Sequence, residues 1–433
     1  MEYEETLRWL YEQETMGIKF GLANTTELLS RLGDPHLRFR SLHIAGTNGK
    51  GSVSAMAASV LREAGYRTGL YTSPHLVDFR ERIQVDGQPI GQRAMLRLAE
   101  EVRGIAEDMR ASSEAKRLTF FELTTAMAFA HFADQGVEEA VVEVGMGGRL
   151  DATNVLSPDC AVIATIALEH TRYLGPTIAA IAGEKAGIIK PGVPVVTIDQ
   201  TDEALDVIRA RAAELAAPLK VVGRDVGYQL IGSSLDGTEV FVEELGAAVR
   251  VPLLGSYQAA NCALACGALV ELMHRGLYIP EEAVPRGLSR VQWPGRLEIV
   301  AEAPRLIFDV SHTPSGARAV AGEVERLVGG KVLLVLGVLE DKDLEGIAAA
   351  FGPIARRAVA AAPRTPRARP AAEVAAALAP YCPAEAADDV GGAIERALAL
   401  AGPEDTVLVT GSLYTIGEAK RWLDGKTGRG DLP

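Results

Sequence analysis

The fold is decided by His43-Ile44-Ala45-Gly46-Thr47-Asn48-Gly49-Lys50-Gly51-Ser52, a short apolar strand that runs into a glycine-rich turn. Such a turn leaves backbone N–H groups free to bind phosphate oxygens, while a lysine reaches the terminal phosphates and a hydroxyl is available to Mg²⁺. The spacing differs from the common phosphate loop, because Gly51 stands between Lys50 and Ser52. A tight structural turn is the alternative, but the order strand, turn, helix favours nucleotide binding.

Strands and helices alternate on both sides of this turn. The predicted elements are two amphipathic helices within 1–32, strands at 42–45, 68–71, 139–144 and 161–165, helices at 50–64 and before 139, and further units to about 222. This alternation predicts a mainly parallel, doubly wound α/β sheet. Short β-like pieces within 238–251 suggest an antiparallel edge, and a helix is expected at 258–275.

The alternation breaks at Trp293-Pro294-Gly295-Arg296 and resumes with predicted strands at 306–309, 332–336 and 407–410. We therefore expect an N-terminal P-loop domain over 1–294 and a smaller Rossmann-like domain over 295–433, joined by a hinge near Pro294. The stretch 356–380 is rich in Ala, Arg and Pro. A solvated loop and helix face explains that composition better than nucleic-acid binding.

Composition limits the classes of function. A length of 433 residues suits two domains, and a net charge of −13 disfavours non-specific binding of nucleic acid. An anionic substrate must then be held by local cations and metal. The four cysteines lack a metal-binding spacing and are expected to be buried thiols in a reducing compartment. No apolar run reaches membrane-spanning length and the acidic N-terminus lacks a signal-peptide core, so a cytoplasmic protein without membrane partners is expected.

Polar residues follow several of the predicted strands. Glu143 ends an apolar strand, where Mg²⁺ would neutralise it, although an ion pair with Arg149 is the alternative. Ser73 offers either a hydroxyl for a metal or a helix cap. His170 lies at the same edge of the sheet and is a candidate Mg²⁺ ligand. Lys185, taken alone, would be a solvated helix charge.

Polar residues also occur at the expected strand ends of the second domain. Arg296 follows the break, Asp309 and His312 follow one strand, and Ser412 follows another. Asn261 lies one helical turn from Gln258 on one helix face. Because the carboxyl ends of parallel strands face ligands, these positions predict a site in the cleft between two domains.

Together these motifs resemble the folylpolyglutamate synthase/dihydrofolate synthase family, which belongs to the Mur ligase superfamily of ATP-dependent amide ligases. The motifs that carry the resemblance are Gly46–Ser52, Thr72–Leu76, Glu143–Asn154, Glu184–Ile188 and Trp293–Arg296. The resemblance covers nearly the whole chain. It implies a Mur-ligase-like central domain over 1–294 and a glutamate-ligase domain over 295–433.

The family resemblance also implies roles for individual residues. ATP would contact Gly49, Lys50, Gly51, Ser52, Asn261, Arg296 and Asp309. Mg²⁺ would be held by Ser73, Glu143 and His170. Catalysis would use Lys50, Lys185 and His170, with Lys185 carbamylated so that an ammonium becomes a carboxylate-like group. The pteridine-bearing substrate would border Thr119, Phe120, Phe121, Glu122, Leu150, Asp151 and Ala152, and glutamate would lie near His312 and Ser412.

Three positions depart from the family pattern. Glu169 stands where Asp is common before the histidine, and Tyr257 stands where His is frequent. Asp309-Val310-Ser311-His312-Thr313-Pro314 replaces the usual Asp-Gly-Ala-His-Asn-Pro. Thr313 can still donate and accept a hydrogen bond in place of Asn, with a shorter reach. This last change lies near the expected glutamate and nucleotide sites.

The predicted function is ATP-dependent addition of L-glutamate to dihydropteroate, to the glutamate tail of reduced folates, or to both, through an acyl phosphate. Its partners would be small molecules alone, and the chain is expected to be a monomer. Two alternatives stay open: a related ligase that acts on another pterin or carboxylate, and a nucleotide-dependent switch. The second-domain residues Arg296, Asp309, His312 and Ser412 favour a ligase, because a simple switch does not need them.

Overall fold

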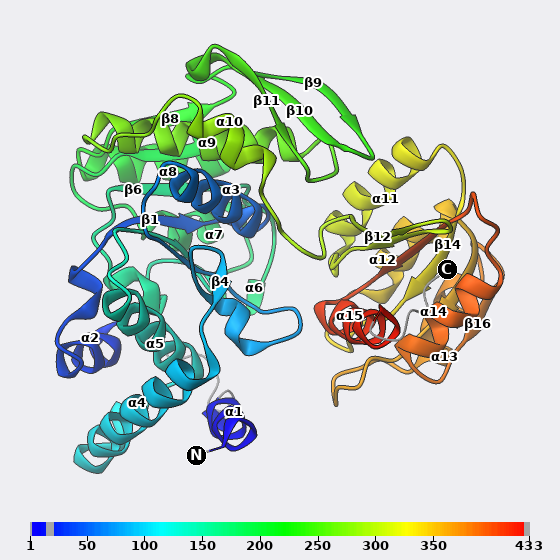
Figure 1. Ribbon diagram of the computed structural model, residues 1–433, viewed down its shortest axis with the longest axis horizontal. Helices are drawn as coiled ribbons and strands as arrows, with labels where there is room; N and C mark the ends of the chain where they lie inside the picture. Colours follow the sequence, from blue (N-terminus) through cyan, green and yellow to red (C-terminus); the bar gives the residue numbers. More distant parts are fainter. Residues whose placement is uncertain (1, 14–20, 428–433) are drawn as a thin grey trace.

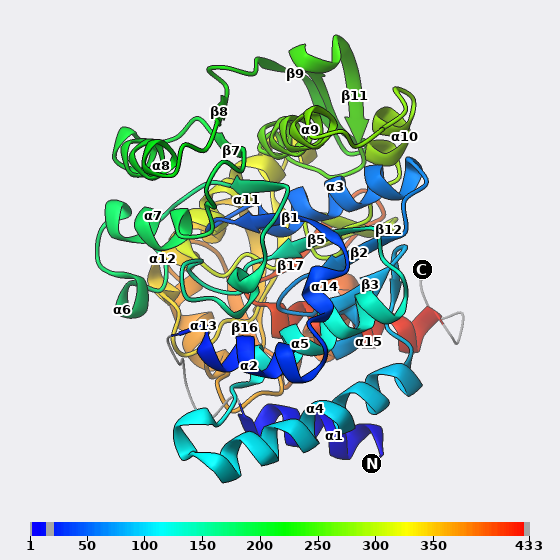
Figure 2. The ribbon, with the colours of Figure 1, turned by 90° about the vertical axis from the view of Figure 1, so that its left-hand side faces the viewer.

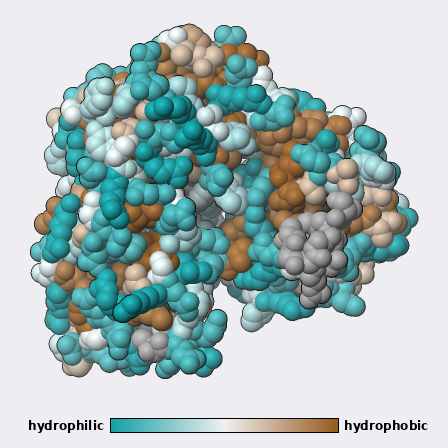
Figure 3. Space-filling model, viewed as in Figure 1, coloured by the Kyte–Doolittle hydropathy of each residue, from teal (hydrophilic) through white to brown (hydrophobic). Residues whose placement is uncertain are grey.

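Two α/β lobes lie side by side in the computed structural model, which describes residues 2–13 and 21–427 (Figure 1). The N-terminal lobe contains an eight-stranded sheet and the C-terminal lobe a six-stranded sheet. In the space-filling view a notch separates the lower parts of the two lobes (Figure 3). The expectation of a mainly parallel α/β fold is confirmed.

The N-terminal sheet has the order β4-β3-β2-β5-β1-β6-β7-β8, and only β3 and β4 run antiparallel to their neighbours. Ile44 pairs with Glu143 in the parallel register of β1 and β5, so the glycine-rich turn and Glu143 leave the same edge of the sheet. Its strands are β1 (Arg40–Ala45), β2 (Thr68–Tyr71), β3 (Ile83–Val85), β4 (Gln88–Pro89), β5 (Glu139–Glu143), β6 (Cys160–Ile163), β7 (Val195–Ile198) and β8 (Leu219–Val222).

Helices cover both faces of this sheet, with α3 and α9 on one face and α4 and α5 on the other (Figure 2). Its helices are α1 (Tyr3–Glu12), α2 (Ala23–Arg31), α3 (Lys50–Glu63), α4 (Gln92–Ser112), α5 (Phe120–Asp134), α6 (Thr171–Leu174), α7 (Ile178–Ala186), α8 (Asp202–Glu214), α9 (Gln258–His274) and α10 (Ala283–Ser289). Helix α3 is almost wholly buried, because its small Ala and Ser side chains let α9 and α10 approach closely.

Two expectations about the N-terminal lobe need correction. The segment 238–251 is not an edge of the large sheet: β9 (Tyr228–Ser234), β10 (Gly237–Val242) and β11 (Ala247–Val251) form a separate antiparallel sheet. Its buried valines pack against α9, which gives these strands a hydrophobic face of their own. The single helix expected before residue 139 is in fact the pair α4 and α5. Helix α5 is buried around most of its circumference, so it lacks a one-sided apolar pattern.

The C-terminal sheet has the order β12-β13-β17-β14-β15-β16, with β12 antiparallel at the edge. Its strands are β12 (Glu298–Glu302), β13 (Arg305–Phe308), β14 (Val332–Leu336), β15 (Ala355–Ala360), β16 (Ala384–Ala386) and β17 (Thr406–Thr410). Its helices are α11 (Pro314–Val328), α12 (Leu344–Phe351), α13 (Ala371–Leu378), α14 (Val390–Ala399) and α15 (Leu413–Thr427). The solvated loop expected within 356–380 is therefore only partly right, since the stretch begins inside β15, where Ala358–Ala360 are buried.

Several smaller expectations can be compared with the structure. The two helices expected within 1–32 are present as α1 and α2, while Met1 and residues 14–20 lie outside the described residues. All four cysteines fall in the described part and are buried free thiols. Within residues 2–13 and 21–427, no helix is both long and apolar enough to cross a bilayer. The boundary at 294/295 stays a prediction.

Candidate active site

The glycine-rich turn holds its lysine close to the loop backbone. Gly49 has φ of 88° and directly precedes α3, which begins at Lys50. A positive φ of this size favours glycine, so the residue type at the turn follows from the backbone. Lys50 Nζ donates to the carbonyl oxygens of Gly46 (3.0 Å) and Thr47 (3.3 Å). The ammonium group therefore lies over the loop, where phosphates would enter.

Glu143 ends β5 beside this lysine. Its side chain is buried, with Oε1 4.0 Å from Lys50 Nζ, and its Oε2 accepts a 3.2 Å hydrogen bond from the backbone N–H of Ser73. Burial raises the pKa of Glu143, although the charge of Lys50 and the bond from Ser73 oppose this shift. The alternative pair with Arg149 is wrong, because Arg149 Nη2 lies 2.8 Å from Glu184 Oε1 instead.

A second lysine approaches the same loop from α7. Lys185 is 1% exposed, and its Nζ donates to the carbonyl oxygen of Gly46 at 2.7 Å. Burial, followed by the charge of Lys50, lowers the pKa of Lys185 to about 7. The alternative of a solvated helix charge is therefore wrong. Two lysines converge on one carbonyl group, and the lowered pKa of the buried one gives it a substantial neutral fraction near pH 7.

His170 is the residue that directly precedes α6. Its φ of 47° is left-handed, and its Nε2 is 3.5 Å from Glu169 Oε1. Burial lowers the pKa of His170, and Glu169 opposes the shift. In the described part of the chain no hydrogen bond joins His170 to Ser73 or Glu143, and no group of three or more His, Cys, Asp or Glu side chains forms a metal site.

One cavity of about 540 Å³, the Ser73 cavity, brings most of the predicted substrate residues together. Its lining includes Ser73, Thr119, Phe120, Phe121, Glu122, Leu150, Asp151, Ala152 and His170. Asp151 is buried and accepts hydrogen bonds from the backbone N–H of Met146 (2.9 Å) and the hydroxyl of Thr153 (2.5 Å). Burial raises the pKa of Asp151. Thr119 and Glu122 also form the capping box that begins α5, so both have a structural role.

Two arginines to which the sequence assigned no role line the Ser73 cavity. Arg82 follows the loop after β2 and is 6% exposed, while Arg367 comes from the C-terminal lobe and pairs with Asp341 at 2.8 Å. Arg82 stands in the charged stretch Phe79-Arg80-Glu81-Arg82-Ile83, whose sequence alone indicates no role for it. No sequence pattern brings Arg367 to this cavity, because it arrives from the other lobe.

The predicted nucleotide residues lie near the junction of the lobes. Asn261 Nδ2 donates to Gln258 Oε1 at 2.9 Å, and its amide packs against Gly49. Asp309 accepts hydrogen bonds from the backbone of Leu297 (3.1 Å) and Ser311 (2.8 Å). Arg296 lies within electrostatic reach of Asp309 and of Glu143 in the other lobe. Its pKa is lowered by burial, while both carboxylates oppose that shift.

Residues expected near glutamate lie at strand ends of the C-terminal sheet. His312 Nδ1 is 3.0 Å from the carbonyl oxygen of Val310, and burial lowers the pKa of His312. Ser412 is buried, and its Oγ accepts a 3.0 Å hydrogen bond from the backbone N–H of Thr415 in the first turn of α15. Thr313, one of the departures, caps α11 through the backbone N–H of Gly316.

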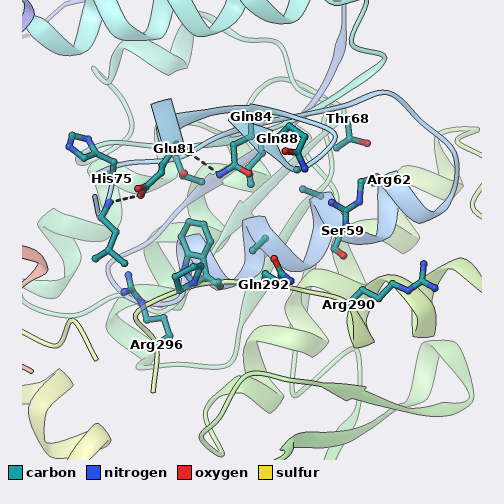
Figure 4. A pocket seen from close by; sticks show the side chains of 18 of the residues that line it. Ser59, Arg62, Thr68, His75, Glu81, Gln84, Gln88, Arg290, Gln292 and Arg296 are labelled. Carbon is teal, nitrogen blue, oxygen red and sulfur yellow. Dashed lines mark hydrogen bonds between the residues drawn. The ribbon is translucent and has the colours of Figure 1, made fainter. Parts of the chain in front are cut away.

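A further cavity of about 540 Å³, the Trp293 cavity, lies between α3, the β3–β4 hairpin and the linker after α10 (Figure 4). The indole of Trp293 packs directly against Gly51, where a Cβ atom would collide with the ring. Glu81 borders this cavity and accepts hydrogen bonds from the backbone N–H groups of Leu76 (2.7 Å), Val77 (3.0 Å) and Asp78 (2.7 Å). One carboxylate thus holds the loop between β2 and β3 in place.

Comparisons with known proteins identify relatives of this chain. Residues 44–269 match the Mur ligase middle domain, and residues 295–413 match the Mur ligase, glutamate ligase domain. A dihydrofolate synthase/folylpolyglutamate synthase of Bacillus subtilis is 36% identical over 430 residues, which cover 97% of this chain and 99% of that protein. The structure of Mycobacterium tuberculosis folylpolyglutamate synthase complexed with ADP and AMPPCP superposes with a TM-score of 0.88 at 33% identity, covering 97% of this chain and 98% of that one.

A longer relative is also similar. A probable bifunctional folylpolyglutamate synthase/dihydropteroate synthase of Haloferax volcanii is 37% identical over 434 residues. The alignment covers 97% of this chain and 50% of that protein. The chain thus spans half of the length of this relative and nearly the whole length of the Bacillus protein.

Proposed function

Because this chain belongs to the folylpolyglutamate synthase/dihydrofolate synthase family of Mur ligases, we propose that its cluster of Lys50, Glu143 and Lys185 activates a pterin-bearing acid with ATP. The chain is an ATP-dependent ligase that adds L-glutamate. Membership of the family excludes the nucleotide-dependent switch as the primary function. The observation that carries the proposal is that Glu143, 4.0 Å from Lys50, accepts a hydrogen bond from the backbone N–H of Ser73, which lines the same cavity as Asp151.

In the proposed reaction a carboxylate oxygen of the acid attacks the γ-phosphorus of ATP, and ADP leaves. The α-amine of L-glutamate, after losing a proton, then attacks the acyl carbon, and phosphate leaves as the amide forms. Lys50 lies over the phosphate loop and stabilises negative charge on the transferring oxygens. Arg296, within electrostatic reach of Glu143, adds positive charge from the linker side.

The residues fit a magnesium ion in part. Glu143 is a buried carboxylate with a raised pKa, and an adjacent cation would favour its charged form. Mg²⁺ takes few protein ligands beside substrate phosphates, which suits one carboxylate with Ser73 and His170 nearby. When bound, the ion would neutralise phosphate charge.

Carbamylation of Lys185 is proposed on chemical grounds. A carbamate forms from a neutral amine, and the pKa of Lys185 is lowered to about 7 by burial and by Lys50. The resulting group would be anionic and would lie beside Lys50, which shares the carbonyl of Gly46. This places a negative charge beside the positive charge of Lys50.

The acceptor is proposed to be dihydropteroate or a reduced folate that already carries glutamate. Phosphate release, measured with each acid and a panel of amino acids, tests this proposal. Release that requires both the acid and L-glutamate supports it. Release that is unchanged when both are omitted contradicts it. The cytoplasmic location and the monomeric state stay predictions.

A further inference from the structure

The strand that leads into the phosphate loop carries a buried histidine. His43 lies in β1, shortly before Gly46, and its side chain is fully buried. Leu42 and Ile44 pack in the core on the α3 side of the sheet, so the side chain of His43 points to the opposite side. Burial, followed by the charge of Lys190, lowers the pKa of His43 to about 3. The ring is therefore neutral, with one N–H donor and one acceptor nitrogen.

The two ring nitrogens of His43 have different surroundings. Its Nε2 is 2.8 Å from Thr153 Oγ1, whereas no described residue offers a hydrogen bond to the buried Nδ1. The hydroxyl of Thr153 donates to Asp151 Oδ1 at 2.5 Å, so Thr153 Oγ1 accepts its bond from the N–H of His43. The proton of the ring therefore lies on Nε2, and Nδ1 is a buried acceptor without a donor.

The unpaired Nδ1 is a cost that an apolar side chain would avoid. A buried polar atom without a partner destabilises a fold, because it loses its hydrogen bonds to water and gains none. The flanking residues Leu42 and Ile44 are aliphatic and fully buried, so β1 readily accommodates such side chains. Stability alone therefore does not explain a histidine at position 43, and the bond to Thr153 is the feature that requires it.

This bond continues into the wall of the Ser73 cavity. Thr153 belongs to the short 3-10 turn Ala152–Val155, and its backbone N–H donates to Asp151 Oδ1 at 3.0 Å. The other oxygen of Asp151 accepts the backbone N–H of Met146 at 2.9 Å. Asp151 and Met146 both line the cavity, whereas His43 lies outside its lining. A chain of hydrogen bonds thus joins His43, through Thr153 and Asp151, to the cavity wall.

Strand β1 therefore supports both halves of the proposed reaction. Its carboxyl end continues into Gly46, whose carbonyl oxygen accepts from Lys50 and Lys185, while His43 holds the cavity wall through Thr153. The acid has to meet the γ-phosphate at a reacting distance, and a misplacement of about 1 Å can lower a rate by about 10²-fold. A bond between the strand of the phosphate loop and the wall of the acid cavity fixes this distance.

We propose that His43 is a positioning residue that aligns the pterin-bearing acid with ATP, by holding Asp151 through the hydroxyl of Thr153. The inference rests on the proposed function, because it assumes that the acid enters the Ser73 cavity. It gives a role to a side chain that lies behind the cavity wall and acts on the acid through its two bonded neighbours.

The test compares stability with binding in His43→Leu. The full chain should unfold at the wild-type temperature or above it, because leucine leaves no unpaired acceptor. The affinity for pteroic acid, measured by calorimetry with Mg²⁺ and AMPPCP, should fall by about tenfold, as should kcat for phosphate release. The affinity for AMPPCP alone should keep its wild-type value, because the phosphate loop is unchanged. A histidine with a structural role alone would instead lower the unfolding temperature.

His43→Gln is the rescue variant, because a glutamine amide can donate to Thr153 Oγ1 from nearly the place of the ring nitrogen. It should restore most of the affinity for pteroic acid. His131→Gln is the matched control. His131 is a second buried histidine of the N-terminal lobe with a pKa lowered by burial, and it lies near the end of α5 that is remote from the Ser73 cavity. Its variant should bind pteroic acid as the wild type does.

The hydroxyl of Thr153 provides an independent measurement. Thr153→Val should weaken the binding of pteroic acid, and Thr153→Ser, which keeps the hydroxyl, should not. The double variant His43→Leu/Thr153→Val should lose no more affinity than the larger single loss, since both changes break one chain of bonds. The two Thr153 variants carry the test if His43→Leu does not fold.

Four outcomes would overturn the inference: wild-type affinity for pteroic acid in a folded His43→Leu, equal losses in His43→Leu and His43→Gln, additive losses in the double variant, and a parallel loss of affinity for AMPPCP. Equal affinities in Thr153→Val and Thr153→Ser would count against it in the same way. If the wild-type chain does not bind pteroic acid with AMPPCP present, the proposed substrate class fails instead, because His43 is intact in that chain.

Discussion

The two lobes present polar residues at the carboxyl ends of their sheets with different hydrogen-bond partners. In the N-terminal lobe, Glu143 and Lys185 are buried with pKa values shifted towards their neutral forms. In the C-terminal lobe, Asp309 accepts two backbone N–H groups and Ser412 caps a helix. Burial also raises the pKa of Asp309 and lowers that of His312, so the two edges differ in their partners. The two lysines of the first edge converge on one carbonyl of the phosphate loop, whereas Asp309 and Ser412 accept backbone N–H groups of their own lobe.

This difference indicates which lobe takes part in the reaction and which lobe positions a substrate. Lysines beside a phosphate loop can act on transferring oxygens, whereas side chains that accept backbone N–H groups fix backbone geometry. We infer that the N-terminal lobe carries the charge changes of the reaction and that the C-terminal lobe positions the second substrate. Substitutions in the first lobe should then lower kcat, and substitutions in the second should mainly change KM for glutamate or stability.

The largest effect is expected for Lys50→Ala. Loss of this ammonium removes a positive group aimed at the transferring phosphate, so kcat should fall by about 10³-fold. Phosphate release at saturating substrates measures this. Lys116→Ala, which removes a surface pair with Glu27, is the control and should keep the wild-type rate. A Lys50→Ala rate within tenfold of the wild type would remove the lysine from the mechanism.

Glu143→Gln keeps the size of the side chain and removes its charge. We expect kcat/KM for ATP to fall by about 10²-fold and the half-saturating Mg²⁺ concentration to rise. Because burial raises the pKa of Glu143, the wild-type enzyme should also lose activity with falling pH at a higher pH than an exposed carboxylate would give. Rates measured over a Mg²⁺ titration check the first effect. An unchanged Mg²⁺ dependence would argue against Glu143 as a ligand.

Lys185→Met should lower kcat by tens of fold if its carbamate takes part in the reaction. The neutral amine grows in fraction as pH rises through about 7, so activation by bicarbonate should increase between pH 6 and pH 8.

The folded-state pKa of Lys185 lies below the unfolded value, so the folded chain binds fewer protons between about pH 7 and about pH 10.4. The free energy of unfolding should therefore rise with pH in this window, relative to Lys185→Met. Denaturation at pH 7 and pH 9 checks the sign, and an opposite sign would contradict it.

The smallest effect is expected for Ser412→Ala in the C-terminal lobe. Loss of the cap of α15 should cost about 1 kcal/mol of stability. KM for glutamate should rise several-fold, while KM for ATP stays close to its wild-type value. Asp389→Ala removes the cap of α14 and should cost similar stability without changing either KM. Equal KM values for the two variants would leave Ser412 with a structural role alone.

The phosphate loop and the strand-end residues could be predicted from sequence because they depend on local order. An apolar strand followed by Gly46–Ser52 specifies both the turn and the direction of its backbone donors. Glu143 could be placed beside Lys50 because parallel strands share one edge. The roles of the predicted site residues remain predictions, since the fold brings many of them together without testing what they bind.

Other features depend on packing that no local pattern contains. Lys185 has the local sequence of a surface residue and is buried only because α7 packs against the loop. Arg82 lines the Ser73 cavity because Glu81 holds its turn in place. The hydrogen bonds that Glu81 accepts exist only in the folded chain, so no local sequence pattern reveals them. The valines of β10 and β11 show alternation but do not indicate which sheet they join.

The contact between Trp293 and Gly51 links two events that are far apart in the sequence. The indole belongs to the segment connecting the lobes, and the glycine belongs to the turn proposed to hold ATP. A rotation of the C-terminal lobe about this segment would change how the ring packs on the turn, so lobe orientation and nucleotide binding would both act on this one contact. The fluorescence of Trp293 would therefore change with lobe orientation and with nucleotide binding.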